Sequence, residues 1–245
     1  RTSRRQRQMC IRDRYKCVIL DRQITIRIDV FDQKITKLSQ HEKYEKYISF
    51  ICIFIHIFAK ISRNKCSKSL IIHLSLTRFK KKLPSDKEKM ISIDNVNSAV
   101  TTKCSGKGEM FIYREEEWMK VFIHEAIHSF GMDIDDNISQ LIQQYMKNIF
   151  HINSVFNVSE AYTETWARIL NCAYCSYQSS KQNKEGIVAF QTYYNFCIII
   201  ERIFALLQLR KILRFKKLYY KNLFENNKHD IVGKNYVYKE DRNTS

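Results

Sequence analysis

The spacing of apolar residues changes along the chain, from alternation in the first half to helical intervals in the second. Alternating apolar positions at Ile24, Ile26, Ile28 and Val30 predict a strand within residues 16–30. Residues 69–78 and 110–113 predict two further strands, and residues 91–108 have a loop-like composition. A dense apolar run over residues 48–61 predicts a buried helix. Its fourteen residues fall short of the roughly 20 that cross a bilayer, so we expect no membrane span.

Helical spacing dominates after residue 113. Apolar side chains cover one broad side of residues 118–130, and Gly131 is a suitable helix stop. Amphipathic helices are predicted over residues 138–150 and 159–178, the second with Ser159 as its N-cap, and residues 186–224 predict one long helix or two. The order predicts an α+β fold, in which a small N-terminal mixed sheet packs on the helix of residues 118–130 and a mainly helical part follows.

The stretch HEAIH, residues 124–128, carries the most specific chemistry in the chain. Positions i and i+4 share one helical face, so His124 and His128 can direct ring nitrogens at one metal ion. Glu125 is turned by about 100° from His124, which suits a base acting on water beside the metal. Glu115, Glu116 and Glu117 are expected in the first helical turn, where carboxylates are stabilised. The alternative is a core helix with two hydrogen-bonded histidines.

A catalytic zinc site requires a third protein ligand, and the helix of residues 159–178 offers two carboxylates. Glu160 and Glu164 are separated by four residues and therefore share a face. We expect Glu160 to bind the metal and Glu164 to form a hydrogen bond with a ligand histidine.

Two other positions remain open as the third ligand. Some zincins carry a ligand three residues beyond a glycine that corresponds to Gly131, but Ile134 occupies that slot here, with Asp133 and Asp135 on either side. His151 is the other alternative.

HEAIH followed by Glu160-x-x-x-Glu164 resembles the gluzincin clan of zinc metallopeptidases. More closely, residues 95–100, 111–133 and 159–172 resemble an uncharacterised family of zincin-like metallopeptidases encoded by giant DNA viruses. The resemblance spans roughly residues 65–178. It implies a zincin-like fold, a Zn²⁺ cofactor, proteolysis of a peptide or protein substrate, and an intracellular location in the host cytoplasm or the virion.

The two ends of the chain differ from its middle. Residues 1–14 resemble a translated sequencing adapter, so we expect a non-native or disordered arm there. Residues 15–240 are predicted to form a single catalytic domain, strand-rich over 15–113 and helical over 114–240. By comparison with the viral family, the C-terminus is expected to be truncated.

The formal net charge of +17 points to nucleic acid only weakly. Six Arg and one Asp within residues 1–14 supply +5 of it, and an AT-rich coding sequence would favour Lys. Basic residues within 202–221 are expected on a solvated helix face, with nucleic acid or an anionic surface as the rival partner. The cysteines are expected to be mostly reduced, and Cys172 and Cys175 are expected to be buried thiols.

These observations lead to the hypothesis of zinc-dependent peptide hydrolysis. His124, His128 and Glu160 would hold the ion, Glu125 would accept a proton from water, and Tyr162, Tyr174 or His151 are unranked candidates for stabilising the oxyanion. The alternatives are a non-enzymatic protein that binds nucleic acid through residues 202–221, and a zincin fold with a purely structural metal.

Overall fold

The structure is a computed structural model, and it describes residues 11–30, 37–62, 65–85, 91, 93–151, 156–183 and 186–224. The chain divides into two compact units. Unit 1 comprises Arg1–Lys82 and Val96–Asp133, and unit 2 comprises Leu83–Asn95 and Ile134–Ser245. The sequence predicted a single domain whose helical part begins at residue 114. In the structure the helix that follows residue 114 packs with the sheet of unit 1, and the long continuous segment of unit 2 begins at Ile134.

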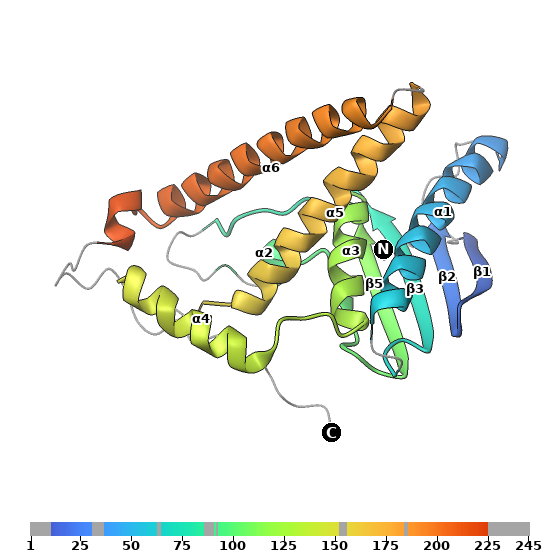
Figure 1. Ribbon diagram of the computed structural model, residues 1–245, viewed down its shortest axis with the longest axis horizontal. Helices are drawn as coiled ribbons and strands as arrows, with labels where there is room; N and C mark the ends of the chain where they lie inside the picture. The colour runs from blue at the N-terminus through green and yellow to red at the C-terminus, as the bar shows by residue number, and fades with distance from the viewer. Residues whose placement is uncertain are drawn as a thin grey trace, which may run out of the picture. The chain divides into compact units, whose positions relative to one another are not determined.

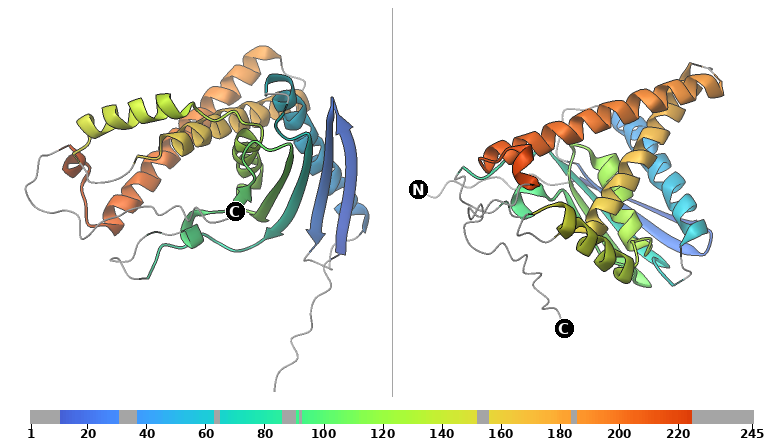
Figure 2. Two further views of the ribbon diagram at one scale, coloured as in Figure 1. Left: turned by 90° about the horizontal axis from the view of Figure 1, so that it is seen from below. Right: turned by 60° about the vertical axis from the view of Figure 1, so that its left-hand side comes forward.

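Unit 1 contains a five-stranded mixed sheet in the order β1-β2-β3-β5-β4. The parallel neighbours β2-β3-β5 are flanked by an antiparallel strand at each edge (Figure 2). The expected α+β class and mixed sheet are therefore confirmed. The loop-like segment 91–108 was expected to hold no strand, but it contains β4. The strands are β1 (Ile11–Ile19), β2 (Arg22–Val30), β3 (Ser69–Thr77), β4 (Ala99–Thr101) and β5 (Lys107–Arg114).

The first two strands form a hairpin, where the sequence predicted one strand. The chain turns at Leu20 and Asp21, and pairing extends to Ile11 opposite Val30. Residues 11–14, assigned above to an N-terminal arm, therefore belong to β1. Antiparallel pairing uses backbone groups, so a basic segment without apolar alternation can still complete the ladder. Residues 1–10 lie outside the described residues.

Two helices of unit 1, α1 (Lys37–Ile61) and α3 (Trp118–Ser129), lie beside each other over the sheet (Figure 1). The strands that they cover show the expected period of two: in β5, Gly108, Met110, Ile112 and Arg114 are buried and the residues between them are exposed. One buried face and one exposed face make unit 1 a two-layer structure.

Aromatic side chains fill the space between α1 and α3. The ring of Phe50 lies 5.8 Å from that of Phe122 and 5.5 Å from that of Trp118, and Phe58 lies 6.0 Å from Phe130. Trp118, Phe122 and Phe130 follow the four-residue spacing of one helical face, so a single row of contacts fixes the rotation of α3 about its axis.

Unit 2 is helical in its described part. Its long helices are α4 (Asp136–Ile149), α5 (Val158–Gln182) and α6 (Ile187–Phe215). The short turns α2 (Ile93–Val96), which begins in this unit, and η1 (Tyr220–Leu223) complete it. The three predicted helices are confirmed, but Asn157 rather than Ser159 caps α5, accepting a hydrogen bond from the backbone N–H of Glu160 at 3.2 Å. Within the described ranges, we find no helix whose length and apolar content would suffice to span a bilayer.

Replacing Phe122 by alanine should lower the free energy of unfolding by roughly 3–5 kcal/mol, because its fully buried ring fills the centre of the α1–α3 contact. Urea denaturation would measure the change. Phe79→Ala removes the same atoms from a side chain that is 75% exposed and should leave stability nearly unchanged. Equal losses in the two variants would contradict this description of the core.

Candidate metal centre

Helix α3 carries the HEAIH stretch, and its start is set by the backbone before it. The sequence placed Glu115, Glu116 and Glu117 in the first turn, but α3 begins at Trp118 because Glu117 adopts a left-handed conformation with φ of 59°. Each glutamate instead pairs with a cation: Glu116 with Arg114 at 2.8 Å, Glu115 with Lys43 at 3.7 Å and Glu117 with Lys120 at 3.5 Å. These pairs hold the sharp turn between β5 and α3.

The aromatic contacts of α3 determine the direction in which its histidines project. His124 stands two positions after Phe122 and His128 two positions after Ala126, so each histidine is turned by about 200° from a residue of the buried row. The helix rotation fixed by α1 therefore places the two imidazoles together on another side. Their Nε2 atoms lie 3.2 Å apart, and their rings are tilted by 72°.

A separation of 3.2 Å suits two ligands of one ion. With Zn–N bonds near 2.05 Å and a tetrahedral angle, two nitrogens lie roughly 3.3 Å apart. His128 is buried, and its other ring nitrogen, Nδ1, contacts a carboxylate oxygen of Asp133. An ionised carboxylate accepts a hydrogen bond, so it favours the tautomer that carries the proton on Nδ1 and leaves a lone pair on Nε2. The donor set therefore fits a divalent metal with a preference for imidazole nitrogen.

The contact between Asp133 and His128 is the feature of this site that sequence reasoning missed. In the sequence, Asp133 stands beside the slot for a third ligand and out of register with it, whereas in the structure its carboxylate contacts Nδ1 of His128. The sequence feature that could have indicated this contact is Gly131. A glycine that reverses the chain just after a ligand helix returns the next polar residue to the last helical turn.

Gly131 ends α3 as predicted, with φ of +65°. The backbone N–H of Met132 donates to the carbonyl of Ile127 at 2.9 Å, and that of Gly131 donates to His128 at 3.1 Å. This pair of bonds is the Schellman arrangement, in which a left-handed residue satisfies the last helical carbonyls. The reversal brings Asp133 back to His128.

A disulfide between Cys66 and Cys104 packs directly against this turn. A Cβ added to Gly131 would lie 2.9 Å from the sulfur of Cys66 and 3.0 Å from the Cβ of Cys104. The backbone N–H of Cys104 also donates to the carbonyl of His128 at 3.2 Å, and the hydroxyl of Ser67 donates to Ser129 at 2.8 Å. The expectation of mostly reduced cysteines is wrong for Cys66 and Cys104. The described free cysteines are Cys17, Cys52, Cys172, Cys175 and Cys197.

Glu125 lies in the same helix and is also buried, with 9% of its surface exposed. It directly follows His124, so its carboxylate leaves the helix at a different angle from the two imidazoles. A buried carboxylate is costly unless other groups stabilise its charge, which makes this position an unusual choice for a helix with a purely structural role.

The two later glutamates lie in unit 2, on α5. Glu160 is in the first turn and half-buried, and its backbone is held by the Asn157 cap. Glu164 accepts a hydrogen bond from Arg168 Nε at 2.9 Å, and Arg168 also bonds Glu201 at 3.1 Å. Glu164 thus belongs to a charged network that links α5 to α6, in addition to any role beside the metal.

The other open positions have structural roles. Asp135 caps α4 by accepting a hydrogen bond from the backbone of Asn137 at 2.9 Å. The backbone N–H of His151 donates to Leu223 at 2.9 Å, and its side chain is exposed. Both contacts lie within unit 2, where they fix the two ends of α4.

The lone Cys-x-x-Cys pair on α5 lacks the properties of a reactive site. Burial, and next the charge of Glu201, raise the pKa of the Cys172 thiol to about 11. Burial raises the pKa of Cys175 as well, with a further contribution from Cys197. The prediction of buried thiols holds for Cys172, whereas Cys175 is exposed as a residue although its thiol is partly removed from water. Protonated thiols are poor nucleophiles and poor metal ligands at neutral pH.

No protein-family model, curated protein or solved structure matches this chain in the comparisons made.

Gly131→Ala should destabilise unit 1, because alanine is strained at positive φ and its Cβ would press on the disulfide. The left-handed conformation alone costs about 1–2 kcal/mol, and the close contact adds to it. Thermal unfolding followed by circular dichroism would measure the loss. Gly186→Ala is the matched control, since no atom lies within 4 Å of its added Cβ. A Gly131→Ala protein as stable as the control would contradict the described turn.

Proposed function

We propose that the chain is a zinc-dependent metallopeptidase of zincin type, in which His124, His128 and Glu160 bind the ion. The observation that carries this proposal is the pair of Nε2 atoms 3.2 Å apart, with Asp133 on the outer nitrogen of His128. Two lone pairs at that distance repel each other unless a cation or a proton lies between them. A metal ion resolves the conflict and gives the Asp133 contact a function.

Glu160 is proposed as the third ligand. The sequence motivates this choice, because Glu160 and Glu164 share one face of α5 and Glu160 stands in the first turn of that helix. Two imidazoles and one carboxylate form a common donor set for catalytic zinc, and they leave a position open for substrate or water. The capped first turn of α5 restrains the backbone that carries Glu160. Glu164 is proposed to orient a ligand histidine, as the sequence predicted.

Zinc, when bound, supplies the Lewis acidity that makes water a nucleophile near neutral pH. Glu125 is proposed to accept a proton from that water on a carboxylate oxygen and to pass it to the leaving amine nitrogen. Its burial on α3 keeps the carboxylate at a fixed angle from both histidines. Asp133 keeps the ring of His128 in one orientation, so the ligand nitrogens need little rearrangement.

A peptide substrate is the choice that the HEAIH stretch favours, because a buried carboxylate beside two imidazoles suits hydrolysis of an uncharged carbonyl compound. β4 is an edge strand of the sheet and, among the described strands, pairs only with β5. An extended peptide could add to such an edge by strand pairing.

Glu125→Gln should bind zinc as tightly as the wild-type protein and hydrolyse peptides roughly 10²–10⁴-fold more slowly, because glutamine cannot accept the proton. Elemental analysis of the purified protein would measure zinc, and a chelator-sensitive assay on mixed peptides would measure hydrolysis. Glu109→Gln is the control, since Glu109 is exposed on β5.

The outcomes separate the hypotheses. Full activity of Glu125→Gln would exclude Glu125 as the base, and a wild-type protein free of divalent metal would exclude the metal centre. A wild-type protein that retains zinc, hydrolyses no peptide and unfolds when the zinc is removed would favour a purely structural metal.

Asp133→Asn should weaken zinc binding by roughly 10–100-fold, because the neutral amide no longer stabilises the Nδ1–H tautomer of His128. Competition with a chromophoric chelator would give the affinity. Asp136→Asn makes the same chemical change at an exposed position in the first turn of α4 and should leave the affinity unchanged. An unchanged affinity in Asp133→Asn would show that its contact with His128 does not support metal binding.

A further inference from the structure

Within the described part of unit 2, α5 contacts the first half of α6 more than its C-terminal half. The two helices meet where α5 ends and α6 begins, and they diverge along their length (Figures 1 and 2). Arg168 on α5 contacts Glu201 at 3.1 Å, and Ser176 contacts Cys197 at 3.9 Å. Past these contacts, most α6 side chains are exposed.

One continuous apolar stripe runs along the exposed surface of α6, from a point before these contacts to a point beyond them. Phe196, Ile199, Ile203 and Leu206 follow spacings of three and four residues and therefore share one face of α6. Their side chains are between 49% and 66% exposed. Single exposed apolar residues are common on protein surfaces. A contiguous row of large apolar side chains instead marks a surface that binds another protein or a membrane.

The same stripe becomes basic toward the end of the helix. Arg210, Arg214 and Lys217 continue the spacing of three and four residues from Leu206. These cations border a cavity of about 780 Å³ on unit 2. Among its lining residues are the apolar side chains Leu206, Leu209, Leu213 and Leu218.

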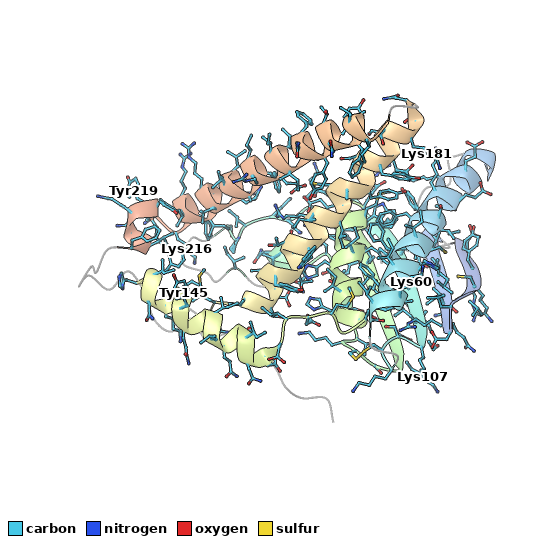
Figure 3. All side chains as sticks on the ribbon, in the orientation of Figure 1. Lys60, Lys107, Tyr145, Lys181, Lys216 and Tyr219 are labelled. Atoms are coloured by element: carbon cyan, nitrogen blue, oxygen red, sulfur yellow. A yellow bond between two sulfur atoms is a disulfide. The ribbon has the colours of Figure 1, made fainter. Side chains whose placement is uncertain are left out.

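Two tyrosines follow directly after the basic end. Tyr219 is 74% exposed and Tyr220 is 58% exposed, and both border the same cavity. Figure 3 shows Lys216 and Tyr219 together where α6 ends. Tyrosine combines an apolar ring with a hydroxyl that needs water or a polar group, which suits the boundary between an apolar and an aqueous phase.

We propose that this face of unit 2 docks on the surface of an anionic lipid bilayer. Acyl chains would cover the apolar stripe and enter the leucine-lined cavity, while lipid phosphates would neutralise Arg210, Arg214 and Lys217. The helix lies along the surface and does not cross the membrane, in keeping with its exposed cations. This inference does not depend on the metal centre.

Charge argues against the rival occupants. Residues 201–221 contain seven Lys or Arg and one acidic residue, Glu201, which is paired with Arg168. Two copies of this face would therefore bring like charges together. Nucleic acid would satisfy the cations but would leave the row from Phe196 to Leu206 in water. An anionic bilayer satisfies both halves of the stripe.

Co-sedimentation of the full chain with vesicles tests the proposal. The protein should sediment with vesicles of phosphatidylcholine mixed with phosphatidylserine and should bind vesicles of phosphatidylcholine alone much more weakly. Arg210→Glu/Arg214→Glu should reduce partitioning by at least roughly thirtyfold. Lys147→Glu/Lys181→Glu, with the same change in charge at exposed positions on α4 and α5, should reduce it far less.

A second pair of variants tests the apolar half. Ile203→Ser/Leu206→Ser should also lose vesicle binding, although it keeps every charge, and circular dichroism would verify that its helices remain. Equal binding to both vesicle types, or unchanged binding of either double variant, would overturn the proposal. Two further results would overturn the proposal if the protein does not bind vesicles. One is dimerisation that Ile203→Ser/Leu206→Ser abolishes, and the other is salt-sensitive binding to single-stranded DNA.

Discussion

The rotation of α3 about its own axis is the constraint on which unit 1 depends. Phe50 and Phe58 of α1 contact Phe122 and Phe130, and the burial of these rings holds α3 in its rotation. Once one side of a helix is fixed, every other side chain on it has a defined direction. The meeting of His124 and His128 is thus a result of hydrophobic packing elsewhere on the helix. Metal sites require rigid support of this kind, because ligands that must first be ordered bind weakly.

The far end of α3 is held by a different set of interactions. Gly131 reverses the chain, the Cys66–Cys104 disulfide fills the space beside it, and Asp133 returns to His128. These residues lie up to 67 positions apart in the sequence, yet they act on a single helical turn. Because Gly131, the disulfide and Asp133 all restrain this turn, the Nε2 atoms of His124 and His128 can stay close together despite their mutual repulsion.

Local patterns in the sequence sufficed for much of the fold. The helices and the alternating strands followed from the spacing of apolar residues, and Gly131 was recognisable as a stop. The long-range features were not accessible in this way. The pairing of β1 with β2 relies on backbone hydrogen bonds that any side chains allow, the Cys66–Cys104 bond joins segments with no shared pattern, and Asp133 reaches His128 only because the chain folds back. Likewise, the left-handed backbone of Glu117 delays the start of α3 to Trp118. Helix propensity alone would favour a start one turn earlier.

The Cys66–Cys104 bond closes a loop with a sequence separation of 38 that contains β3, α2 and β4. Residues Leu83–Asn95, which belong to unit 2, lie inside that loop, while both cysteines belong to unit 1. A single backbone cleavage anywhere between the two cysteines would therefore leave one covalently connected molecule. Its two fragments would separate on a denaturing gel only after a reductant had been added.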